Sequence, residues 1–367
     1  MQRAYTADTI FTGSEWLSDH AVVINHTTIE SVIELSDLNN NIELTRFEGS
    51  IIPAFIDIQI YGASNKLLAV NPVPETLQVI NNYSRKGGAI LFLPTVATNT
   101  REVFYKCIDA VRQYWNEGRP GVWGLHLEGP WLNPTKRGAH IEELIHAPTM
   151  EGAEALLEYG RGVIKMITLA PEMCSTAVIH LIKSKGIIVS AGHSDATYEE
   201  ATDSFDAGIS TVTHLYNAMS GLQHRAPGVV GACFNHPHVH SSIIADGHHV
   251  DFAAIAIAKR LMGERLFVIT DAVAETIEGY YKHQLIGDKY ECNGILSGSA
   301  ITMHQSCVNL IQKAGIDEGE AIRMCSLYPA RVLGCDNKYG RIAAGYSSQM
   351  LLIDNKWKLT QILPDSL

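Results

Sequence analysis

Four residues that suit metal-dependent hydrolysis stand at or near the ends of separate apolar runs in this chain. Glu128, His193 and His214 each lie at the end of one run, and Asp271 lies at the end of another. One carboxylate and two imidazoles are a common ligand set for a catalytic divalent cation, which keeps an open position for water and lowers the pKa of that water. A nearby aspartate can take the proton from the water and later pass it to a leaving group. These residue types therefore indicate hydrolysis, provided that the fold brings them together.

The elements that must position these residues are eight short runs rich in Val, Ile and Leu, which alternate with helix-like stretches. The runs mostly lack sustained polar alternation, as is typical of parallel strands covered on both faces. Several of the stretches between them begin near Thr or Asp and end at Gly, which matches helix capping at both ends. The eight expected strands are residues 51–60, 89–95, 121–128, 163–171, 186–193, 209–215, 241–247 and 266–272.

This alternation predicts a (β/α)8 TIM-type barrel of the metal-dependent hydrolase kind over residues 51–335. A doubly wound open sheet is the rival, but no G-x-G-x-x-G motif follows the first run. Residues 1–50 and 336–367 instead carry short β-like pieces separated by turn residues. Neither end could bury much apolar surface alone, so we expect the two ends to pair in one small β-sandwich domain.

A ring of polar residues occupies the C-terminal ends of the expected strands. In a barrel all these ends open on one face, where the loops of the active site lie. Polar groups at the end of a single strand would be unremarkable, whereas a convergent ring predicts a site. The ring comprises Asp57, Gln59, His126, Glu128, His193, His214, Asp246, His248, His249 and Asp271.

Each member of the ring also has an ordinary structural interpretation. A single histidine at a strand end is more often hydrogen-bonded in a structural role, and an aspartate before alanine, as at Asp271, is more often a helix cap. Three ligand-type residues on separate strands of one barrel favour the metal site when they are taken together. The histidines of HPHVH (236–240) precede the seventh strand, so we expect them at the opposite end of the barrel.

Three basic residues lie in loops on the expected active face. Lys136 and Arg137 could contact an anion, but a solvated loop explains them more simply. Arg225 lies in a loop bounded by Gly and Pro after the sixth strand. Its planar guanidinium could donate two parallel hydrogen bonds to a phosphate, although a lone arginine is weak support for a phosphate site.

The bulk composition excludes several classes of partner. The 367 residues carry a formal net charge of −11 without a basic run, which argues against a nucleic-acid surface. The N-terminus has no basic-then-apolar signal pattern, and no apolar run approaches the ~20 residues of a membrane helix. The seven cysteines form no C-x-x-C pair, as is typical of reduced thiols. We therefore expect a cytoplasmic protein with a small-molecule substrate and no nucleic-acid or membrane partner.

Nine blocks along nearly the whole chain resemble those of the N-acetylglucosamine-6-phosphate deacetylases of the amidohydrolase superfamily, in family order. The resemblance implies hydrolysis of the N-acetyl group of N-acetyl-D-glucosamine 6-phosphate, which gives D-glucosamine 6-phosphate and acetate. It also implies a homodimer in which Arg225 reaches the neighbouring subunit's site. The blocks are PAFIDIQIYG, LFLPTVATN, HLEGPWLNPTKRGAH, AGHSDATYEEA, THLYNAMSGLQHRAPGVVGA, ADGHHVD, ITDA, LSGSAITM and YPARVLG.

The same resemblance implies a role for each matched residue. Glu128, His193 and His214 match the metal ligands. Asp271 matches the catalytic acid/base, and His140 matches a histidine near the scissile amide that would help to stabilise the oxyanion. The implied substrate contacts are Ala139, His140, Asn217, Ala218, Arg225, Asp246, Gly247, His248, His249, Leu296, Ser297 and Gly298.

One departure from the wider superfamily bears on the number of metal ions. Many amidohydrolases place His-x-His after the first strand and bind a second metal there, whereas this chain has Gln59 and Tyr61 at those positions. Glutamine is a poor ligand for a transition metal, and tyrosine is usually protonated near pH 7. We therefore expect one divalent cation per subunit, with Zn²⁺ favoured over Fe²⁺, Co²⁺ and Mn²⁺. His126 could serve as an extra ligand or could support Glu128 from the same face of its strand.

Three other functions stay open at this stage. A deacetylase for the galactosamine epimer differs in the position of one hydroxyl, which the sequence does not resolve. Other amidohydrolase activities, such as adenine deamination, ring opening like that of dihydroorotases or dipeptide hydrolysis, more often use His-x-His or a bridging lysine, and no lysine ends an expected barrel strand here. A catalytically silent sensor of sugar phosphates would not need every ligand-type residue together with Asp271.

Overall fold

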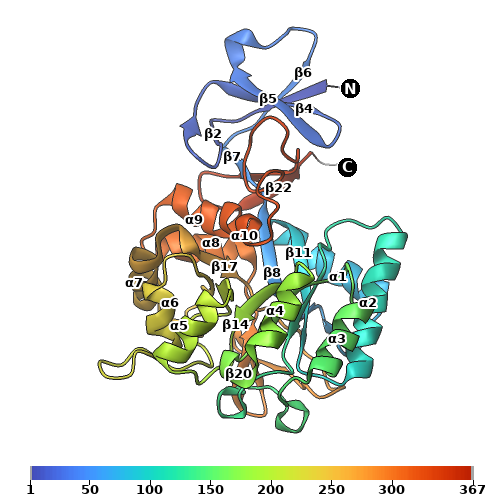
Figure 1. Ribbon diagram of the computed structural model, residues 1–367. Helices are drawn as coiled ribbons and strands as arrows, with labels where there is room; N and C mark the ends of the chain where they lie inside the picture. The colour runs from blue at the N-terminus through green and yellow to red at the C-terminus, as the bar shows by residue number, and fades with distance from the viewer. Residues whose placement is uncertain (1, 365–367) are drawn as a thin grey trace.

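A closed barrel of eight parallel strands forms the centre of the molecule in the computed structural model, which describes residues 2–364 (Figure 1). Hydrogen bonds link the strands in the order β17-β16-β15-β14-β13-β12-β11-β8. The backbone N–H of Asp271 donates to the carbonyl of Gln59 at 2.9 Å, so β17 and β8 close the circle and the predicted barrel is confirmed. The strands are β8 (Phe55–Ile60), β11 (Ala89–Ala97), β12 (Leu125–Glu128), β13 (Ile164–Leu169), β14 (Ile188–Ala191), β15 (Thr211–Val212), β16 (His240–Ile244) and β17 (Leu266–Ile269).

Helices cover the outside of the barrel, and their caps follow from the sequence. The side chain of Thr100 accepts a hydrogen bond from the N–H of Val103, and Thr197 forms a reciprocal capping box with Glu200. The expected helices between the strands are therefore confirmed. The helices are α1 (Pro74–Lys86), α2 (Arg101–Asn116), α3 (Met150–Tyr159), α4 (Thr176–Ser184), α5 (Tyr198–Asp206), α6 (Gly228–Asn235), α7 (Phe252–Met262), α8 (Met303–Gln312), α9 (Glu318–Cys325) and α10 (Leu327–Val332).

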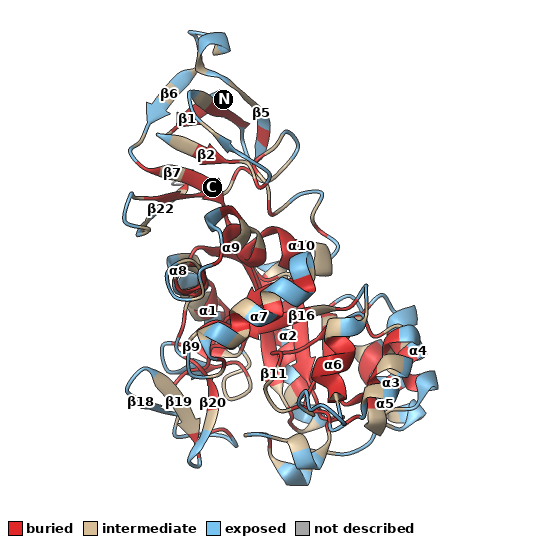
Figure 2. Ribbon diagram, turned by 90° about the vertical axis from the view of Figure 1, so that its left-hand side faces the viewer, coloured by how far each residue is buried: buried red, intermediate tan, exposed pale blue. Residues whose placement is uncertain are grey.

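Strands from both ends of the chain form two small sheets that face each other beyond the barrel, as Figures 1 and 2 show. Their buried side chains share one apolar cluster, to which Ile24 contributes from one sheet and Met350 from the other. The predicted β-sandwich built from both termini is therefore confirmed, whereas its boundaries stay predictions. One sheet has the order β5-β4-β1-β6, with β5 (Thr28–Glu34), β4 (His20–Asn25), β1 (Gln2–Thr6) and β6 (Glu43–Arg46). The other has the order β22-β21-β7-β2-β3, with β22 (Leu359–Leu363), β21 (Met350–Ile353), β7 (Ser50–Pro53), β2 (Thr9–Phe11) and β3 (Trp16–Leu17).

The first expected strand, residues 51–60, is in fact two strands in different sheets. Strand β7 pairs with β2 and β21 of the terminal sandwich, and β8 starts two residues later in the barrel. Because β8 begins beside the terminal sheets, its C-terminal end points away from them (Figure 1). The mouth of the barrel that carries the predicted site therefore lies far from the terminal sandwich.

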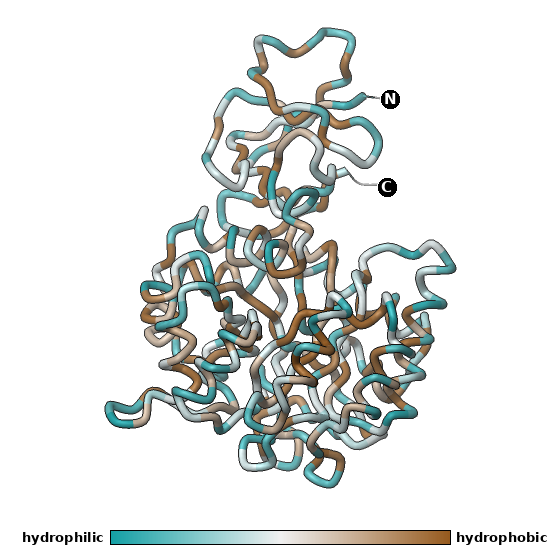
Figure 3. The backbone as a smooth tube through the Cα atoms, viewed as in Figure 1, coloured by the Kyte–Doolittle hydropathy of each residue, from teal (hydrophilic) through white to brown (hydrophobic). Residues whose placement is uncertain are grey.

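A three-stranded antiparallel sheet follows β17 at this mouth, and the sequence did not predict it. Strands β18 (Gln284–Ile286), β19 (Lys289–Cys292) and β20 (Ile295–Ser299) form it, with much intermediate and exposed surface in Figure 2. Its pieces are short and mix polar with apolar residues, so no strand period stands out. Over the described residues, hydrophobic stretches follow the barrel strands and the outer loops are mostly hydrophilic (Figure 3). Within residues 2–364, no helix is both long and apolar enough to cross a membrane.

We expected Asp57 to join the polar ring at the mouth of the barrel, but it does not. Its carboxylate is buried and accepts hydrogen bonds from the hydroxyl of Thr270 at 2.5 Å and from the N–H of Thr270 at 3.2 Å. Burial raises the pKa of Asp57 from 3.8 to about 7, although the hydrogen bonds from Thr270 oppose this rise. The residue is therefore part of the packed barrel wall.

We expect the Asp57→Asn variant to lose part of the pH dependence of folding stability. The folded carboxyl holds its proton more tightly than the unfolded one, so its contribution to the free energy of unfolding falls as pH rises from about 4 to about 7. The fall amounts to roughly 4 kcal/mol if the full shift applies. Urea denaturation at several pH values should show the free energy of unfolding of the variant rising relative to that of the wild type as pH rises from about 4 to about 7. A stability difference that does not change with pH would contradict the prediction.

Candidate metal-dependent active site

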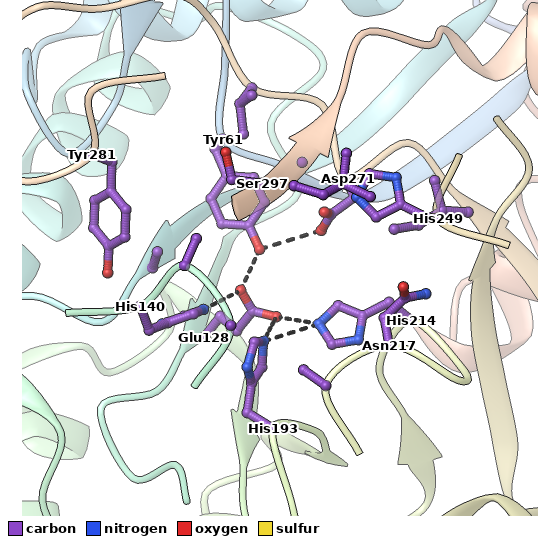
Figure 4. Close-up of a pocket in the computed structure, with 18 of the residues that line it drawn as sticks. Tyr61, Glu128, His140, His193, His214, Asn217, His249, Asp271, Tyr281 and Ser297 are labelled. Atoms are coloured by element: carbon purple, nitrogen blue, oxygen red, sulfur yellow. Dashed lines mark hydrogen bonds and ion pairs between the residues drawn. The ribbon is translucent and has the colours of Figure 1, made fainter. Parts of the chain in front are cut away.

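One cavity of about 340 Å³ at the mouth of the barrel collects most of the predicted site residues. The four residues from which the sequence prediction starts, Glu128, His193, His214 and Asp271, all line it, and each is at most 7 % exposed (Figure 4). They come from four different strand ends, as expected from the barrel topology. The other predicted residues that line the cavity are Ala139, His140, Asn217, Ala218, His249, Leu296, Ser297 and Gly298.

Three donor atoms converge within the cavity. Nε2 of His214 lies 3.0 Å from Oε1 of Glu128 and 3.1 Å from Nε2 of His193, and the third side of this triangle measures 3.4 Å. Three atoms bound to one tetrahedral Zn²⁺ at 2.0–2.2 Å would lie roughly 3.3–3.6 Å apart, within a few tenths of an ångström of the three measured distances. The spacing and the chemistry of Glu128, His193 and His214 thus fit a single divalent cation.

His193 and His140 both lie beside Glu128, and the hydrogen bonds at Nδ1 distinguish one ring from the other. The donor atoms of Glu128, His140 and His193 lie within 4.8 Å of one another, so distance alone would admit His140 as a ligand. Nδ1 of His193 lies 2.9 Å from the carbonyl of Lys136, which can only accept, so Nδ1 carries the proton and Nε2 keeps its lone pair. Nδ1 of His140 accepts from the backbone N–H of Thr98 at 3.3 Å, so Nε2 carries the proton. His193 can therefore bind a cation through Nε2, whereas His140 presents a donor.

Burial and the neighbouring groups shift the pKa values of Glu128 and His140. Burial raises the pKa of Glu128, but hydrogen bonds and charges from the surrounding imidazoles outweigh it and hold that pKa well below its usual range. Burial lowers the pKa of His140 to about 4, so this ring is neutral near pH 7. A neutral imidazole with a proton on Nε2 can donate a hydrogen bond to a developing oxyanion.

Asp271 has the setting of an acid/base group. Its Oδ1 accepts a hydrogen bond from Nε2 of Gln59 at 2.7 Å, and the hydroxyl of Tyr61 lies 3.4 Å away. Burial, followed by the charge of Glu128, raises the pKa of Asp271 above its ordinary value. A carboxylate with a raised pKa is a better proton acceptor, and a pKa nearer the working pH suits a group that must both take up and release a proton.

Gln59 and Tyr61 act as hydrogen-bond donors at the positions where many relatives carry His-x-His. Nε2 of Gln59 donates to Oε1 of Glu128 at 3.1 Å as well as to Asp271, and the hydroxyl of Tyr61 donates to Oε2 of Glu128. Burial, followed by the charges of Asp271 and Glu128, raises the pKa of Tyr61 well above its usual value. Both side chains therefore present protons, not lone pairs, toward the carboxylates.

Three of the four central site residues adopt a backbone conformation that side chains rarely take. The φ angles are +48° at His193, +38° at His214 and +55° at Asp271. Left-handed residues other than glycine cost about 1–3 kcal/mol each and cluster at functional sites. The strand ends thus hold these side chains toward the cavity at the expense of local stability.

The turn that carries His193 is tied to the loop after β12 by Glu172. Its carboxylate accepts from the amide of Asn133 at 2.9 Å, the hydroxyl of Ser194 at 2.7 Å and the N–H of Asp195 at 2.6 Å. The N–H of Asn133 also donates to the carbonyl of His193 at 2.9 Å. These bonds link the two loops that place His193 and the carbonyl of Lys136 against each other.

His126 has a structural role in the barrel interior. Its Nε2 lies 2.8 Å from the hydroxyl of Thr168, and its Nδ1 lies 3.2 Å from the carbonyl of Ile58. Burial lowers its pKa to about 4. Both ring nitrogens are occupied, so the structure favours support of the strand over metal binding.

The segment of Asp246 to His249 divides between the cavity and its surroundings. His249 lines the cavity, and Oδ2 of Asp246 lies 2.6 Å from its Nδ1. Asp246 thus orients His249 and does not itself line the cavity. Gly247 and His248 are exposed outside it, and Nε2 of His248 lies 2.9 Å from Oδ1 of Asp288.

Arg225 is exposed and does not line the cavity of its own chain. It lines a separate depression of about 400 Å³, which Lys136 and Asp195 also line. Lys136, which we expected to be solvated, lines both depressions, and its Nζ lies 3.1 Å from Oδ1 of Asp195. The predicted roles of all these residues toward a substrate stay predictions.

Tyr281 and His283 are two of the lining residues that sequence reasoning missed. They precede β18 in the added sheet, and Nδ1 of His283 lies 2.9 Å from the hydroxyl of Ser297. Both side chains are buried, at 6 % and 5 % exposure. No spacing or motif distinguishes them within the stretch GYYKHQL, so the sequence offers no signal for their position.

A (β/α)8 barrel with a Glu/His/His cluster and a separate carboxylate at its mouth defines the class of metal-dependent hydrolases. Residues 50–365 match the model of the amidohydrolase family, and residues 4–52 match that of the NagA composite domain. The chain belongs to the amidohydrolase family, and its expected place among the N-acetylglucosamine-6-phosphate deacetylases is confirmed.

Relatives and solved structures are similar to this chain over almost its full length. The chain is 34 % identical to the N-acetylglucosamine-6-phosphate deacetylase of Haemophilus influenzae, over 95 % of this chain and 97 % of that one. It is 30 % identical to an N-acetylgalactosamine-6-phosphate deacetylase of Escherichia coli O157:H7, over 99 % and 98 %. The crystal structure of N-acetylglucosamine-6-phosphate deacetylase from Pasteurella multocida superimposes with a TM-score of 0.93 at 32 % identity, over 99 % and 98 %.

Proposed function

We propose that this chain hydrolyses the N-acetyl group of N-acetyl-D-glucosamine 6-phosphate to D-glucosamine 6-phosphate and acetate. The observation that carries the proposal is one cavity in which three atoms able to bind a cation, a carboxylate with a raised pKa and a neutral histidine donor come together. Metal-dependent amide hydrolysis uses these three functions together. The similarity to relatives of this activity supplies the substrate class.

Glu128, His193 and His214 would hold one divalent cation in this proposal, with Zn²⁺ favoured and Fe²⁺, Co²⁺ or Mn²⁺ as alternatives. When bound, such a cation lowers the pKa of water and polarises a carbonyl group. Gln59 donates hydrogen bonds to the carboxylates of Glu128 and Asp271, and Tyr61 donates one to Glu128. Because they offer no free lone pair there, one cation per subunit suffices for the proposal.

The chain's own side chains would carry the proton transfers and the stabilisation of charge. Asp271 takes a proton from the attacking water and returns it to the amine as the C–N bond breaks. His140 donates its Nε2 hydrogen to the acetamide oxygen as negative charge develops there. The carbonyl of Lys136 and the carboxylate of Asp246 orient His193 and His249.

The phosphate would bind at the side of the cavity lined by Asn217, Ala218 and His249. We propose that Arg225 of the partner subunit completes this side in a homodimer, since Arg225 does not line the cavity of its own chain. The loop that carries it projects at the lower left of Figure 1. Apolar side chains exposed on this loop and around the added sheet support such an interface. They are Leu222, Ile277, Tyr280, Leu285, Ile286 and Ile295.

Acetate release from purified protein tests the proposed function directly. N-acetyl-D-glucosamine 6-phosphate and its galactosamine epimer should be compared at equal concentrations, because relatives of both kinds are similar to this chain. We expect the higher kcat/KM with the glucosamine substrate. Release from the galactosamine substrate alone would favour the epimer, and binding of either without acetate release would favour a sensor.

A cytoplasmic location is part of the proposal, since all seven cysteines are free thiols.

We expect the Arg225→Ala variant to have a KM about 10–100-fold higher with a smaller change in kcat, because a charge-assisted contact to the phosphate is lost. The Arg260→Ala variant, on the outer helix α7, should behave as the wild type. Mixing Arg225→Ala with inactive Asp271→Asn subunits should restore activity of low KM, because the second subunit supplies Arg225 to the first. If mixing restores nothing although subunits exchange, the arginine does not act across the interface.

A further inference from the structure

Tyr281, in the segment just before the added sheet, reaches back to the end of barrel strand β11. Its hydroxyl donates a hydrogen bond to the backbone carbonyl of Thr98 at 2.7 Å. Its ring packs edge-on against His140, with the centroids 6.1 Å apart and the planes at 80°. Tyr281 therefore lies beside His140, as Figure 4 shows, and also binds Thr98, the residue that holds Nδ1 of His140.

Thr98 holds His140 through two groups. Its backbone N–H donates to Nδ1 of His140 at 3.3 Å, and its hydroxyl oxygen lies 2.8 Å from the same nitrogen. A backbone N–H can only donate, so it selects the form of the ring with its proton on Nε2. On the opposite edge, Nε2 lies 3.2 Å from Oε2 of Glu128, on the inner side of the cavity. The position of the Thr98 backbone thus decides where His140 presents its donor.

We propose that Tyr281, acting through Thr98, is a positioning residue that keeps the Nε2 proton of His140 directed into the cavity. The inference rests on the proposed function in one respect, because the acceptor of that proton would be the acetamide oxygen. Tyr281 fixes the carbonyl of Thr98, and the adjoining N–H and hydroxyl of Thr98 fix Nδ1 of His140. The segment before the added sheet is therefore coupled to His140 by a chain of direct contacts.

The simplest competing role for Tyr281 is packing of the added sheet against the barrel. Tyr281 belongs to a small apolar cluster with Leu67, Val273 and Ala274. The Tyr281→Phe variant keeps the ring in this cluster and removes only the hydroxyl that binds Thr98. Packing alone therefore predicts no change in turnover, whereas positioning of His140 predicts a loss.

A double-mutant cycle tests the inference in the full-length, metal-loaded enzyme. We expect Tyr281→Phe to lower kcat about three- to tenfold with KM within twofold, as for loss of one hydrogen bond. In the His140→Ala background the same change should have no further effect, because the group that Tyr281 positions is absent. The matched control is Tyr290→Phe, since Tyr290 lies in β19 of the added sheet but does not line the cavity. Equal losses in both backgrounds, or no loss in either, would overturn the proposal.

Nitrogen NMR of histidine-labelled protein gives a second readout that needs no substrate. The His140 signals, assigned by their absence in His140→Ala, should show the form with its proton on Nε2 in the wild type. They should shift toward a mixture of the two ring forms in Tyr281→Phe and stay unchanged in Tyr290→Phe. Unchanged His140 signals in Tyr281→Phe would overturn the inference. If the wild type released no acetate, the proposed function would fail while this experiment still judged the positioning role.

Discussion

The Asp271→Asn variant should lose turnover by at least about 10³-fold while it keeps its metal. An asparagine cannot accept a proton from water at neutral pH, and general acid–base catalysis contributes typically 10²–10⁴-fold. The same residue would also protonate the amine, so both transfers fail together. The side-chain oxygen of asparagine can still accept the hydrogen bond from Gln59, which now measures 2.7 Å. The loss should therefore be chemical and not structural.

The measurement pairs acetate release with metal analysis of the same samples. The Asp109→Asn variant makes the same chemical change on the outer helix α2 and should keep wild-type activity. Equal metal content and equal thermal stability of Asp271→Asn and wild type would assign the loss to proton transfer. If Asp271→Asn retained wild-type kcat, another group would have to act as the base.

The barrel and the four central site residues could be predicted because both follow from local patterns. Glu128, His193, His214 and Asp271 stand where apolar runs end, and barrel topology brings all such ends to one mouth. The prediction needed no knowledge of side-chain rotamers. Convergence of strand ends is a property of the fold and not of any single residue.

Other positions depend on features that the sequence does not display. The pairing of β8 with β11 shifts register twice, so strict alternation does not tell which face Asp57 or Gln59 will occupy. Gln59 faces the carboxylates, whereas Asp57 bonds to Thr270. Tyr281 lies just before an added sheet whose strands are short and partly exposed, and its partner Thr98 is distant in sequence. Nothing in its neighbours indicates that it reaches the cavity.

Removal of the divalent cation should abolish turnover, and the loss should be reversed by one equivalent of metal per chain. Without the cation, no group in the cavity replaces its lowering of the pKa of water. Bound metal also stabilises the folded state, by about 2.7 kcal/mol at a free concentration one hundred times its dissociation constant. A chelated sample should therefore unfold at a lower temperature and recover on addition of Zn²⁺. Activity that persists after the metal has been shown to be absent would contradict the proposed mechanism.

Two histidine variants show which residues hold that cation. The His214→Ala variant should lose metal affinity and turnover together, because Nε2 of His214 lies within 3.1 Å of both other proposed ligand atoms. The His140→Ala variant should keep its metal and lose about 10²–10³-fold in kcat, as expected for the loss of an oxyanion donor. Both histidines are buried beside Glu128, so they are matched in environment. The opposite result would be metal lost from His140→Ala and kept in His214→Ala. It would mean that the cation displaces the proton on Nε2 of His140 and that His140 is one of the ligands.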